Sequence, residues 1–261
     1  MHPILQPAFR QALLSNKILR GIFNSLPSPA IAEICARVGY DFFVQDNEHG
    51  VSSIETTEQI LRATSPYQVP TIVRCLEHDI SRVLDAGALG VQIPMVESPE
   101  MAERIARICR YPTPGDLTGK RGCAFSGRSA TYGLDGGPSY VQASNDSVVV
   151  IAMLESTEAI SRAAEIASVE GIHGVFVGPN DLAHGMGHLN DWQHPKVQKQ
   201  IELALRRISD AGKCPGILSI SATEDARYRD WGARYLACTT TGLIVKALTQ
   251  GLRGPSDQGQ Y

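Results

Sequence analysis

Three ionisable side chains fall within four positions directly after an apolar run. Residues 42–46 read FFVQD, and Asp46 is followed closely by Glu48 and His49. A strand inside a sheet has no use for such an ending unless it meets solvent or a ligand. A histidine three residues after an aspartate could act as a general base whose imidazole the carboxylate orients. A purely structural histidine at a strand–loop junction is the open alternative.

Two more carboxylates and one guanidinium follow other apolar runs. Glu155 follows VVVIAML, Asp181 lies in VGPNDL, and Arg74 lies in TIVRC. Carboxylates that leave neighbouring strands with no lysine beside them repel, raise a pKa or share a cation. Such oxygen ligands suit Mg²⁺ or Mn²⁺. The first turn of a helix also stabilises an acid without any metal, and Arg74 could pair with a loop acid instead of a substrate carboxylate.

The elements that must position these side chains alternate along the whole chain. Eight β-rich runs are separated by segments whose apolar residues recur at three- and four-residue spacing. The runs cover residues 20–26, 41–46, 71–75, 90–96, 148–154, 174–178, 216–220 and 235–239. Helices are expected to stop at Gly39, Gly87, Gly171 and Gly232, because glycine tolerates the left-handed conformation.

Strands that are apolar throughout indicate a parallel sheet covered on both faces. Eight β-then-α units predict a (β/α)₈ barrel, and the competing doubly wound sheet lacks the G-x-G-x-x-G turn after its first strand. We expect one domain over residues 1–261, with a flexible tail at about 253–261. In such barrels the C-terminal ends of the strands carry the active site. The longest irregular stretch, residues 111–133, is predicted to overlie that face.

Composition narrows the class of protein. The net charge is −3, the hydrophobic content is 43%, and no Lys/Arg stripe is present, so neither nucleic acid nor an anionic membrane is an expected partner. The N-terminus lacks the apolar region of a signal peptide, and no apolar run is long enough to span a membrane. Six cysteines occur singly, which fits reduced thiols in the cytoplasm better than a disulfide framework.

At this point the chain resembles the HpcH/HpaI family of class II, metal-dependent pyruvate aldolases, such as 4-hydroxy-2-oxoheptanedioate and 2-keto-3-deoxy sugar acid aldolases. The similarity extends from GIFNSLPSP to CPGILSI and includes DNEHG, LDAGALGVQIPMV, KRGCAFSGRSATYG and LEST. Its most specific part is EGIHGVFVGPNDLAHGMGH. The resemblance implies a (β/α)₈ barrel of the phosphoenolpyruvate/pyruvate type that cleaves a 4-hydroxy-2-oxo acid to pyruvate and an aldehyde.

The resemblance also implies roles for individual residues. Glu155 and Asp181 would bind the divalent metal, Mg²⁺ or Mn²⁺, with Co²⁺ as a further option. His49, oriented by Asp46, would move protons directly or through a water, and Glu48 would support that pair. The pyruvate would be held by Arg74 and the segment Gly178, Pro179, Asn180 and Asp181.

Further roles concern the aldehyde and the assembly. Phe23 and Leu218 match apolar wall positions that face the acceptor aldehyde. Asp85 matches a catalytic residue offered by a neighbouring subunit, because barrel geometry puts it at the far end of a helix. The family usually forms a homohexamer, a trimer of dimers that exchange the last helix, and LIVKALTQGL is apolar enough for that exchange. A metal-stabilised enolate needs no Schiff-base lysine, and no lysine occurs at the eight strand ends.

The sequence departs from the family where the second substrate would bind. The stretch between Arg74 and Asp85 is shortened to CLEHDIS, Met153 replaces a common glutamine, and ACTTTG replaces a V-G-V-D-like turn. The alternatives are a CoA-ester lyase or a decarboxylating synthase of the same enolate superfamily, or a non-catalytic barrel that binds a keto acid. The aldehyde, the stereochemistry and the pathway are not predicted.

Overall fold

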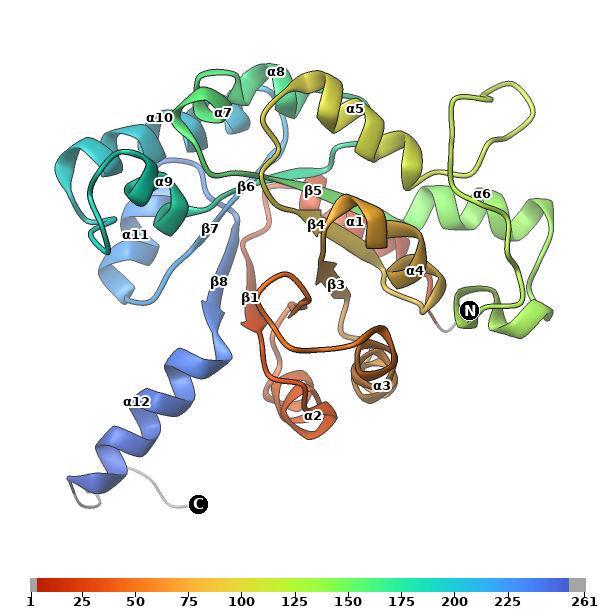
Figure 1. The fold of residues 1–261 in the computed structure, drawn as a ribbon, viewed down its shortest axis with the longest axis horizontal. Coiled ribbons are helices and arrows are strands. Elements are labelled where there is room, and N and C mark those ends of the chain that lie inside the picture. The colour runs from red at the N-terminus through yellow and green to blue at the C-terminus, as the bar shows by residue number, and fades with distance from the viewer. Residues whose placement is uncertain (1–3, 254–261) are drawn as a thin grey trace.

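Eight parallel strands close into a barrel in chain order, as the sequence predicts (Figure 1). The computed structural model describes residues 4–253, so the predicted tail lies outside the described residues except for Arg253. The strands are β1 (Leu19–Asn24), β2 (Phe42–Asp46), β3 (Thr71–Arg74), β4 (Gly90–Ile93), β5 (Val149–Leu154), β6 (Gly174–Val177), β7 (Cys214–Leu218) and β8 (Tyr235–Thr239). The pairing of Leu19 in β1 with Tyr235 in β8 closes the barrel.

Each strand is followed by at least one helix. These helices are α2 (Pro29–Val38), α3 (Ile54–Thr64), α4 (Ile80–Asp85), α5 (Pro99–Ile108), α7 (Thr157–Ser161), α8 (Ala163–Ser168), α9 (Pro179–Gly185), α10 (Pro195–Asp210), α11 (Ala222–Asp230) and α12 (Thr240–Leu252). Short 3₁₀ turns lie at η1 (Ser65–Tyr67), η2 (Glu77–Asp79) and η3 (Arg128–Gly133). The four predicted glycine stops all have left-handed φ angles, between 90° and 102°.

Two sets of buried side chains hold the barrel together. Aromatic rings fill its interior, where Phe42 stacks on Tyr235 with centroids 3.8 Å apart, and Phe23 meets Phe176 at 5.5 Å. A larger aliphatic set packs between the strands and the surrounding helices. The interior is therefore a packed core rather than a channel, and side chains reach a ligand only at its ends.

Two helices that the sequence reading missed lie at the N-terminal end of the barrel. They are α1 (Pro7–Leu14) and α6 (Pro138–Ser147). Phe9 and Leu13 of α1 are buried and join the interior cluster, so α1 closes the barrel from below.

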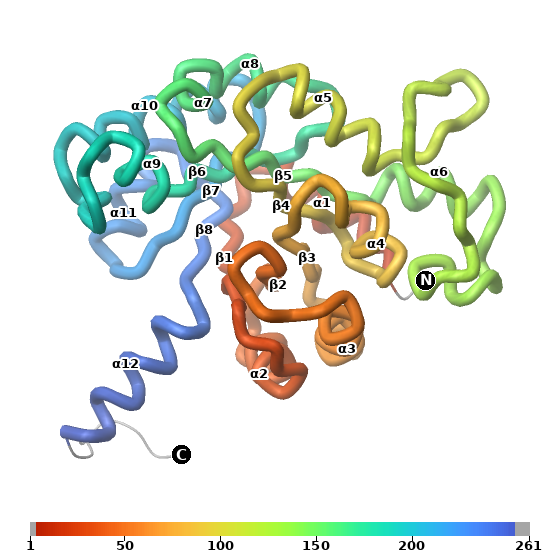
Figure 2. The backbone as a smooth tube through the Cα atoms, viewed as in Figure 1, coloured from red at the N-terminus to blue at the C-terminus, as the bar shows by residue number. Residues whose placement is uncertain are grey.

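The position predicted for residues 111–133 is wrong. This segment follows a helix rather than a strand, so it returns to the N-terminal face, away from the ends that carry the active site. Its Arg121 pairs with Asp85 at the end of α4, and Tyr111 packs against Leu5 near the start of the chain. Figure 2 shows the segment folding beside α6 at this end of the molecule.

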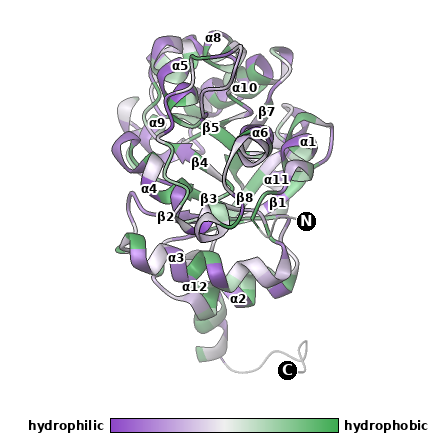
Figure 3. Cartoon of the chain, turned by 90° about the vertical axis from the view of Figure 1, so that its right-hand side faces the viewer, coloured by the Kyte–Doolittle hydropathy of each residue, from purple (hydrophilic) through white to green (hydrophobic). Residues whose placement is uncertain are grey.

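The last helix stands apart from the barrel in both ribbon views (Figures 1 and 3). Its apolar side chains Leu243, Val245, Leu248 and Leu252 are exposed. In Figure 3 the hydrophobic colour continues along this projecting helix. An exposed apolar surface of this kind is typical of an interaction site. Within residues 4–253, no helix combines the length and apolarity that a membrane crossing requires.

Candidate active site

A cavity of about 320 Å³ opens at the C-terminal ends of the strands. Ten of the residues singled out from the sequence line it, and they come from β1, β2, β3, β7 and the segments that follow β2, β5 and β6. They are Phe23, Asp46, His49, Arg74, Glu155, Gly178, Pro179, Asn180, Asp181 and Leu218. The predicted site residues thus meet in one cavity, with two exceptions: Glu48 lies beside it, 3.4 Å from Arg74, and Asp85 is absent from its lining.

Arg74 and Asp46 form a two-point ion pair in the cavity. Their positions are paired in the β2–β3 ladder, so both side chains leave adjacent strand ends. The guanidinium donates from Nε to Oδ1 at 2.9 Å and from Nη2 to Oδ2 at 2.6 Å. Its Nη1 lies 3.4 Å from Oε2 of Glu48. Burial alone would lower the pKa of Arg74, but the Asp46 and Glu48 carboxylates raise it above its usual value.

The expected orientation of His49 by Asp46 is not present in this structure. Asp46 Oδ1 instead accepts the backbone N–H groups of Glu48 and His49, at 3.1 and 3.2 Å, as well as Arg74. The imidazole is 64% exposed, and its Nε2 lies 3.7 Å from Glu48 Oε2. The reason is competition: the planar guanidinium takes both Asp46 oxygens from the adjacent strand. His49 is left exposed on the loop after β2.

Glu155 is a buried carboxylate of the cavity, with 8% of its surface exposed. The turn after β4 gives Met95 a left-handed φ of 52°, and its N–H donates to Oε2 of Glu155 at 2.7 Å. A Cβ atom at position 178 would lie 2.7 Å from Oε1, so glycine lets this carboxylate keep its position. Burial raises the pKa of Glu155 to about 7. The hydrogen bond from the Met95 N–H opposes this rise, whereas the nearby negative charges of Asp181 and Glu48 add to it.

Asp181 lies in the first turn of α9, next to Asn180, and both residues are exposed. Its charge acts on Glu155, so the two predicted ligands share one electrostatic environment. Excess negative charge on oxygen ligands suits Mg²⁺ or Mn²⁺. The two side chains therefore fit a divalent cation with few protein ligands. Among residues 4–253, no group of three or more His, Cys, Asp or Glu side chains is arranged to hold a metal.

The rest of the cavity is mixed in character. Phe23 is an apolar wall that also carries the Arg74 guanidinium 5.2 Å from its ring centroid. The sequence reading did not single out Ser25, Phe176 and Thr241, which line the cavity together with Met153 and Thr239. Ser25 and Thr241 follow strand ends by one or two residues, and this position in the sequence could have indicated that they line the cavity. These hydroxyl groups give the outer part of the cavity hydrogen-bonding capacity.

Asp85 lies at the C-terminal end of α4, on the opposite face of the barrel. Its carboxylate is 3.3 Å from Nη2 of the buried Arg121, and burial raises its pKa against the effect of that arginine. Arg121 also donates to Ser144 of α6 at 3.0 Å. Asp85 therefore cannot reach this cavity within one chain.

Comparisons with known proteins agree with this architecture. The family model described as HpcH/HpaI aldolase/citrate lyase matches residues 19–246. The chain is 36% identical to the hydroxypyruvate/pyruvate aldolase of Delftia acidovorans, covering 93% of this chain and 88% of the relative. It is 34% identical to the 2-keto-3-deoxy-L-rhamnonate aldolase of Escherichia coli K12, covering 100% of both chains.

A solved structure gives the same picture. The HpcH/HpaI aldolase/citrate lyase family protein of Burkholderia cenocepacia superposes with a TM-score of 0.89 at 31% identity, covering 95% of this chain and 98% of the other. The predicted enzyme class, a carbon–carbon lyase of the aldolase type, is confirmed by these relatives, and the other predicted activities are not favoured. The chain belongs to the HpcH/HpaI aldolase/citrate lyase family.

Proposed function

We propose that this barrel is a divalent-metal-dependent aldolase that cleaves a 4-hydroxy-2-oxo acid to pyruvate and an aldehyde. The observation that carries the proposal is the meeting of Glu155, Asp181 and Arg74 in one cavity. Two carboxylates can bind a cation, and a guanidinium can bind the carboxylate of a substrate. The aldolase names of the relatives support the same reaction type.

The keto acid would bind at the floor of the cavity. Arg74 already points its guanidinium along the floor between Asp46 and the Phe23 ring, and it keeps its charge despite burial. The first-turn N–H groups of Asn180 and Asp181 in α9 have no intrahelical acceptor, so they would complete the carboxylate site beside Gly178 and Pro179.

Glu155 and Asp181 would hold Mg²⁺ or Mn²⁺, with Co²⁺ as a further option. When bound, such a cation supplies Lewis acidity at the keto oxygen, where negative charge develops as the carbon–carbon bond breaks. The chain's own part is to fix the Glu155 carboxylate through Met95 and to leave space at position 178.

His49 is the candidate for proton transfer. Its imidazole is exposed at the cavity, close to Glu48, and no contact within residues 4–253 holds it to Asp46. In unliganded sites, catalytic hydrogen bonds are often long and tighten only with substrate. His49 would take the proton of the 4-hydroxyl group in cleavage and return it in synthesis. Leu218 and Phe23 would face the aldehyde.

The proposal extends to assembly and location. A homohexamer built from dimers that exchange α12 would cover the exposed apolar helix and would bring Asp85 of one subunit toward a neighbour's cavity. Each chain would remain one domain over residues 1–261. The free cysteines of the described chain, four of them buried, support the reducing cytoplasm as its location. Its partners would be small oxo acids and aldehydes, not nucleic acid or membrane.

Deuterium exchange at the pyruvate methyl group, followed by NMR, tests the proposal without knowledge of the aldehyde. We expect exchange with Mg²⁺ or Mn²⁺ and none after addition of a chelator, because enolate formation needs the cation. Absence of exchange with each of these metals would contradict the aldolase proposal. Equal exchange in chelated buffer would contradict the metal requirement.

A further inference from the structure

A second cavity, of about 200 Å³, lies at the N-terminal end of the barrel. Its lining includes Arg10 of α1, Asn145 and Asp146 of α6, Arg110 and Glu170 from two returning loops, and His173 just before β6. None of these residues lines the cavity that holds Glu155. The space exceeds that of a single water, whose share of liquid volume is about 30 Å³.

His173 presents a buried donor that lacks an acceptor. Its side chain is 6% exposed, and Nδ1 accepts the N–H of Val150 at 3.0 Å. Burial lowers the pKa of this imidazole to about 3, and Arg10, Lys213 and Arg110 lower it further. The ring is therefore neutral, and its one proton sits on Nε2. Within the described residues Nε2 is buried and has no partner, an arrangement that costs about 1–3 kcal/mol.

Positive charge surrounds this donor. Arg10 is half-buried and donates to the neutral carbonyl oxygen of Asn145 at 2.7 Å. No carboxylate within residues 4–253 lies in ion-pair range of its guanidinium. Burial lowers the pKa of Arg10, and Arg110 lowers it further while Asp146 opposes the change. Lys213 donates to the carbonyl oxygen of Ile172, the residue before His173, at 2.7 Å.

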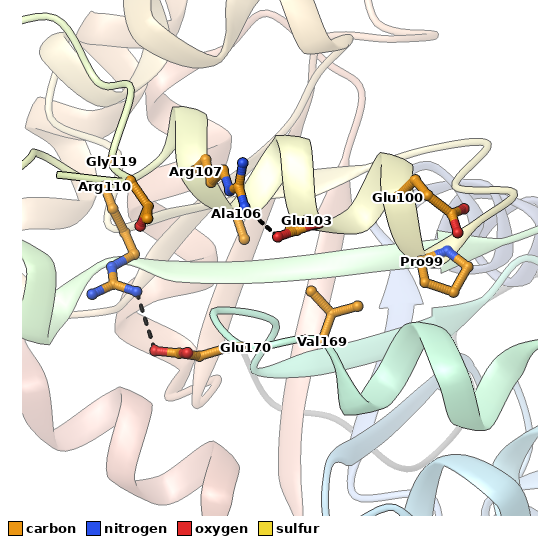
Figure 4. Close-up of a pocket in the computed structure, with 10 residues that line it drawn as sticks. Pro99, Glu100, Glu103, Ala106, Arg107, Arg110, Gly119, Val169 and Glu170 are labelled. Carbon is orange, nitrogen blue, oxygen red and sulfur yellow. Dashed lines mark hydrogen bonds and ion pairs between the residues drawn. The ribbon is translucent and has the colours of Figure 1, made fainter. Parts of the chain in front are cut away.

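The carboxylates of the cavity lie at its rim. Glu170 is 92% exposed and stands 3.4 Å from Arg110, a pair that Figure 4 draws among the residues of a neighbouring pocket. Arg110 also donates to the part-exposed Asp116 at 3.0 Å. Asp146 is exposed, and both of its oxygens accept from Gln142. Solvent screens Glu170 and Asp146 more than it screens the half-buried cations. The interior of the cavity is thus rich in hydrogen-bond donors, and its carboxylates lie toward solvent.

We propose that this cavity is a binding site for a small oxyanion, a phosphate or a carboxylate. The anion accepts from the guanidinium groups of Arg10 and Arg110 and from Nε2–H of His173. Charge-assisted hydrogen bonds of this kind are about twice as strong as neutral ones. The site lies at the opposite end of the barrel from the proposed catalytic cavity and takes no part in its chemistry.

Calorimetric titration of the full-length protein tests the site, with inorganic phosphate in one arm and acetate in the other at matched ionic strength. We expect Arg10→Gln, and separately Arg110→Gln, to weaken binding about tenfold, the equivalent of one charge-assisted hydrogen bond. Arg206→Gln, on the exposed face of α10, is the matched control and retains the wild-type affinity. Binding of phosphate alone or acetate alone identifies the preferred class of oxyanion.

A second control separates the two ends of the barrel. Arg74→Gln removes the only guanidinium of the catalytic cavity's described lining and leaves unchanged the phosphate or acetate binding that Arg10→Gln weakens. Loss of that binding in Arg74→Gln, equal affinity in the Arg10 variant and the wild type, or no binding of either anion would each overturn the proposal.

Discussion

The two ends of the barrel contain buried ionisable groups in opposite settings. At the C-terminal end, Glu155 lies near Asp181 and Glu48, and its pKa rises to about 7. At the N-terminal end, His173 lies near three cations, and its pKa falls to about 3. Burial is the largest cause in both cases, and the neighbours then add to it. The charges around Glu155 oppose its negative form and those around His173 oppose its positive form, so we expect the two ends to favour ligands of opposite sign.

The strongest way to break this contrast is to remove the acid at the catalytic end. We expect Glu155→Gln to lower metal-dependent pyruvate deuteration by about a thousandfold, because a neutral amide cannot hold the cation that supplies roughly 4 kcal/mol. NMR exchange rates and Mn²⁺ affinity measure the effect. Glu158→Gln, three residues away in α7, is the matched control and should behave as wild type. Wild-type exchange in Glu155→Gln would remove the metal assignment.

The next effect concerns Arg74, the positively charged side chain of the catalytic cavity. Arg74→Lys keeps the charge but loses the two-point contact with Asp46. We expect a fall in kcat/KM of about a hundredfold, carried mainly by KM for the oxo acid, because a lysine cannot present two parallel donors. Arg62→Lys on the exposed surface of α3 is the control. A loss confined to kcat would contradict a role in binding.

The C-terminal end of the barrel, with the catalytic cavity, could be predicted from the sequence better than the N-terminal end. In a parallel barrel the strand ends meet at one mouth, so Arg74, Glu155 and Asp181 had to converge once eight strands were recognised. The contact between Arg74 and Asp46 follows from strand register. The orientation of His49 did not follow, because it depends on which group takes the Asp46 oxygens, and spacing along one loop does not decide that.

The cavity at the N-terminal end of the barrel could not be predicted from the sequence. It combines a helix before the first strand, a helix with few apolar residues and two returning loops, whose members are far apart in sequence. Helix α6 contains PSYVQASNDS, a segment without an apolar repeat, and α1 has only Phe9 and Leu13 buried. The misplaced stretch 111–133 belongs here as well. These segments gain their structure from contacts with one another, such as Arg121 with Asp85 and Ser144.

Assembly gives a smaller and separate effect. Val245, Leu248 and Leu252 form an exposed stripe on α12. If a neighbouring barrel covers it, Leu248→Glu should weaken each exchanged helix by roughly 2 kcal/mol and reduce the mass measured by sedimentation. Gln250→Glu places the same carboxylate on the opposite side of the helix and should not change the mass. An unchanged mass in Leu248→Glu would contradict helix exchange.

The smallest effect is the pH dependence of stability that His173 causes at the N-terminal end of the barrel. A histidine with a lowered pKa in the folded state stays neutral there, whereas the unfolded chain binds a proton below about 6.5. Stability from this group is thus complete above pH 6.5 and is lost as pH falls from there toward 3. Relative to a pH well above 6.5, the loss one unit below 6.5 should be roughly 1.4 kcal/mol. Denaturant unfolding of wild type and His173→Gln at about pH 8 and about pH 5.5 measures this loss.

The comparison between these variants isolates His173 because other groups titrate equally in both. The Gln oxygen can still accept the Val150 N–H, and His78→Gln, on the surface, controls for an ordinary histidine. Arg10, Arg110 and Lys213 oppose protonation, whereas Asp146 and Glu170 at the rim favour it only weakly through solvent. A bound oxyanion would supply the missing negative charge, so phosphate should reduce the acid loss in wild type and leave His173→Gln unaffected. Equal pH dependence in wild type and His173→Gln would show that the buried imidazole is not the group that titrates.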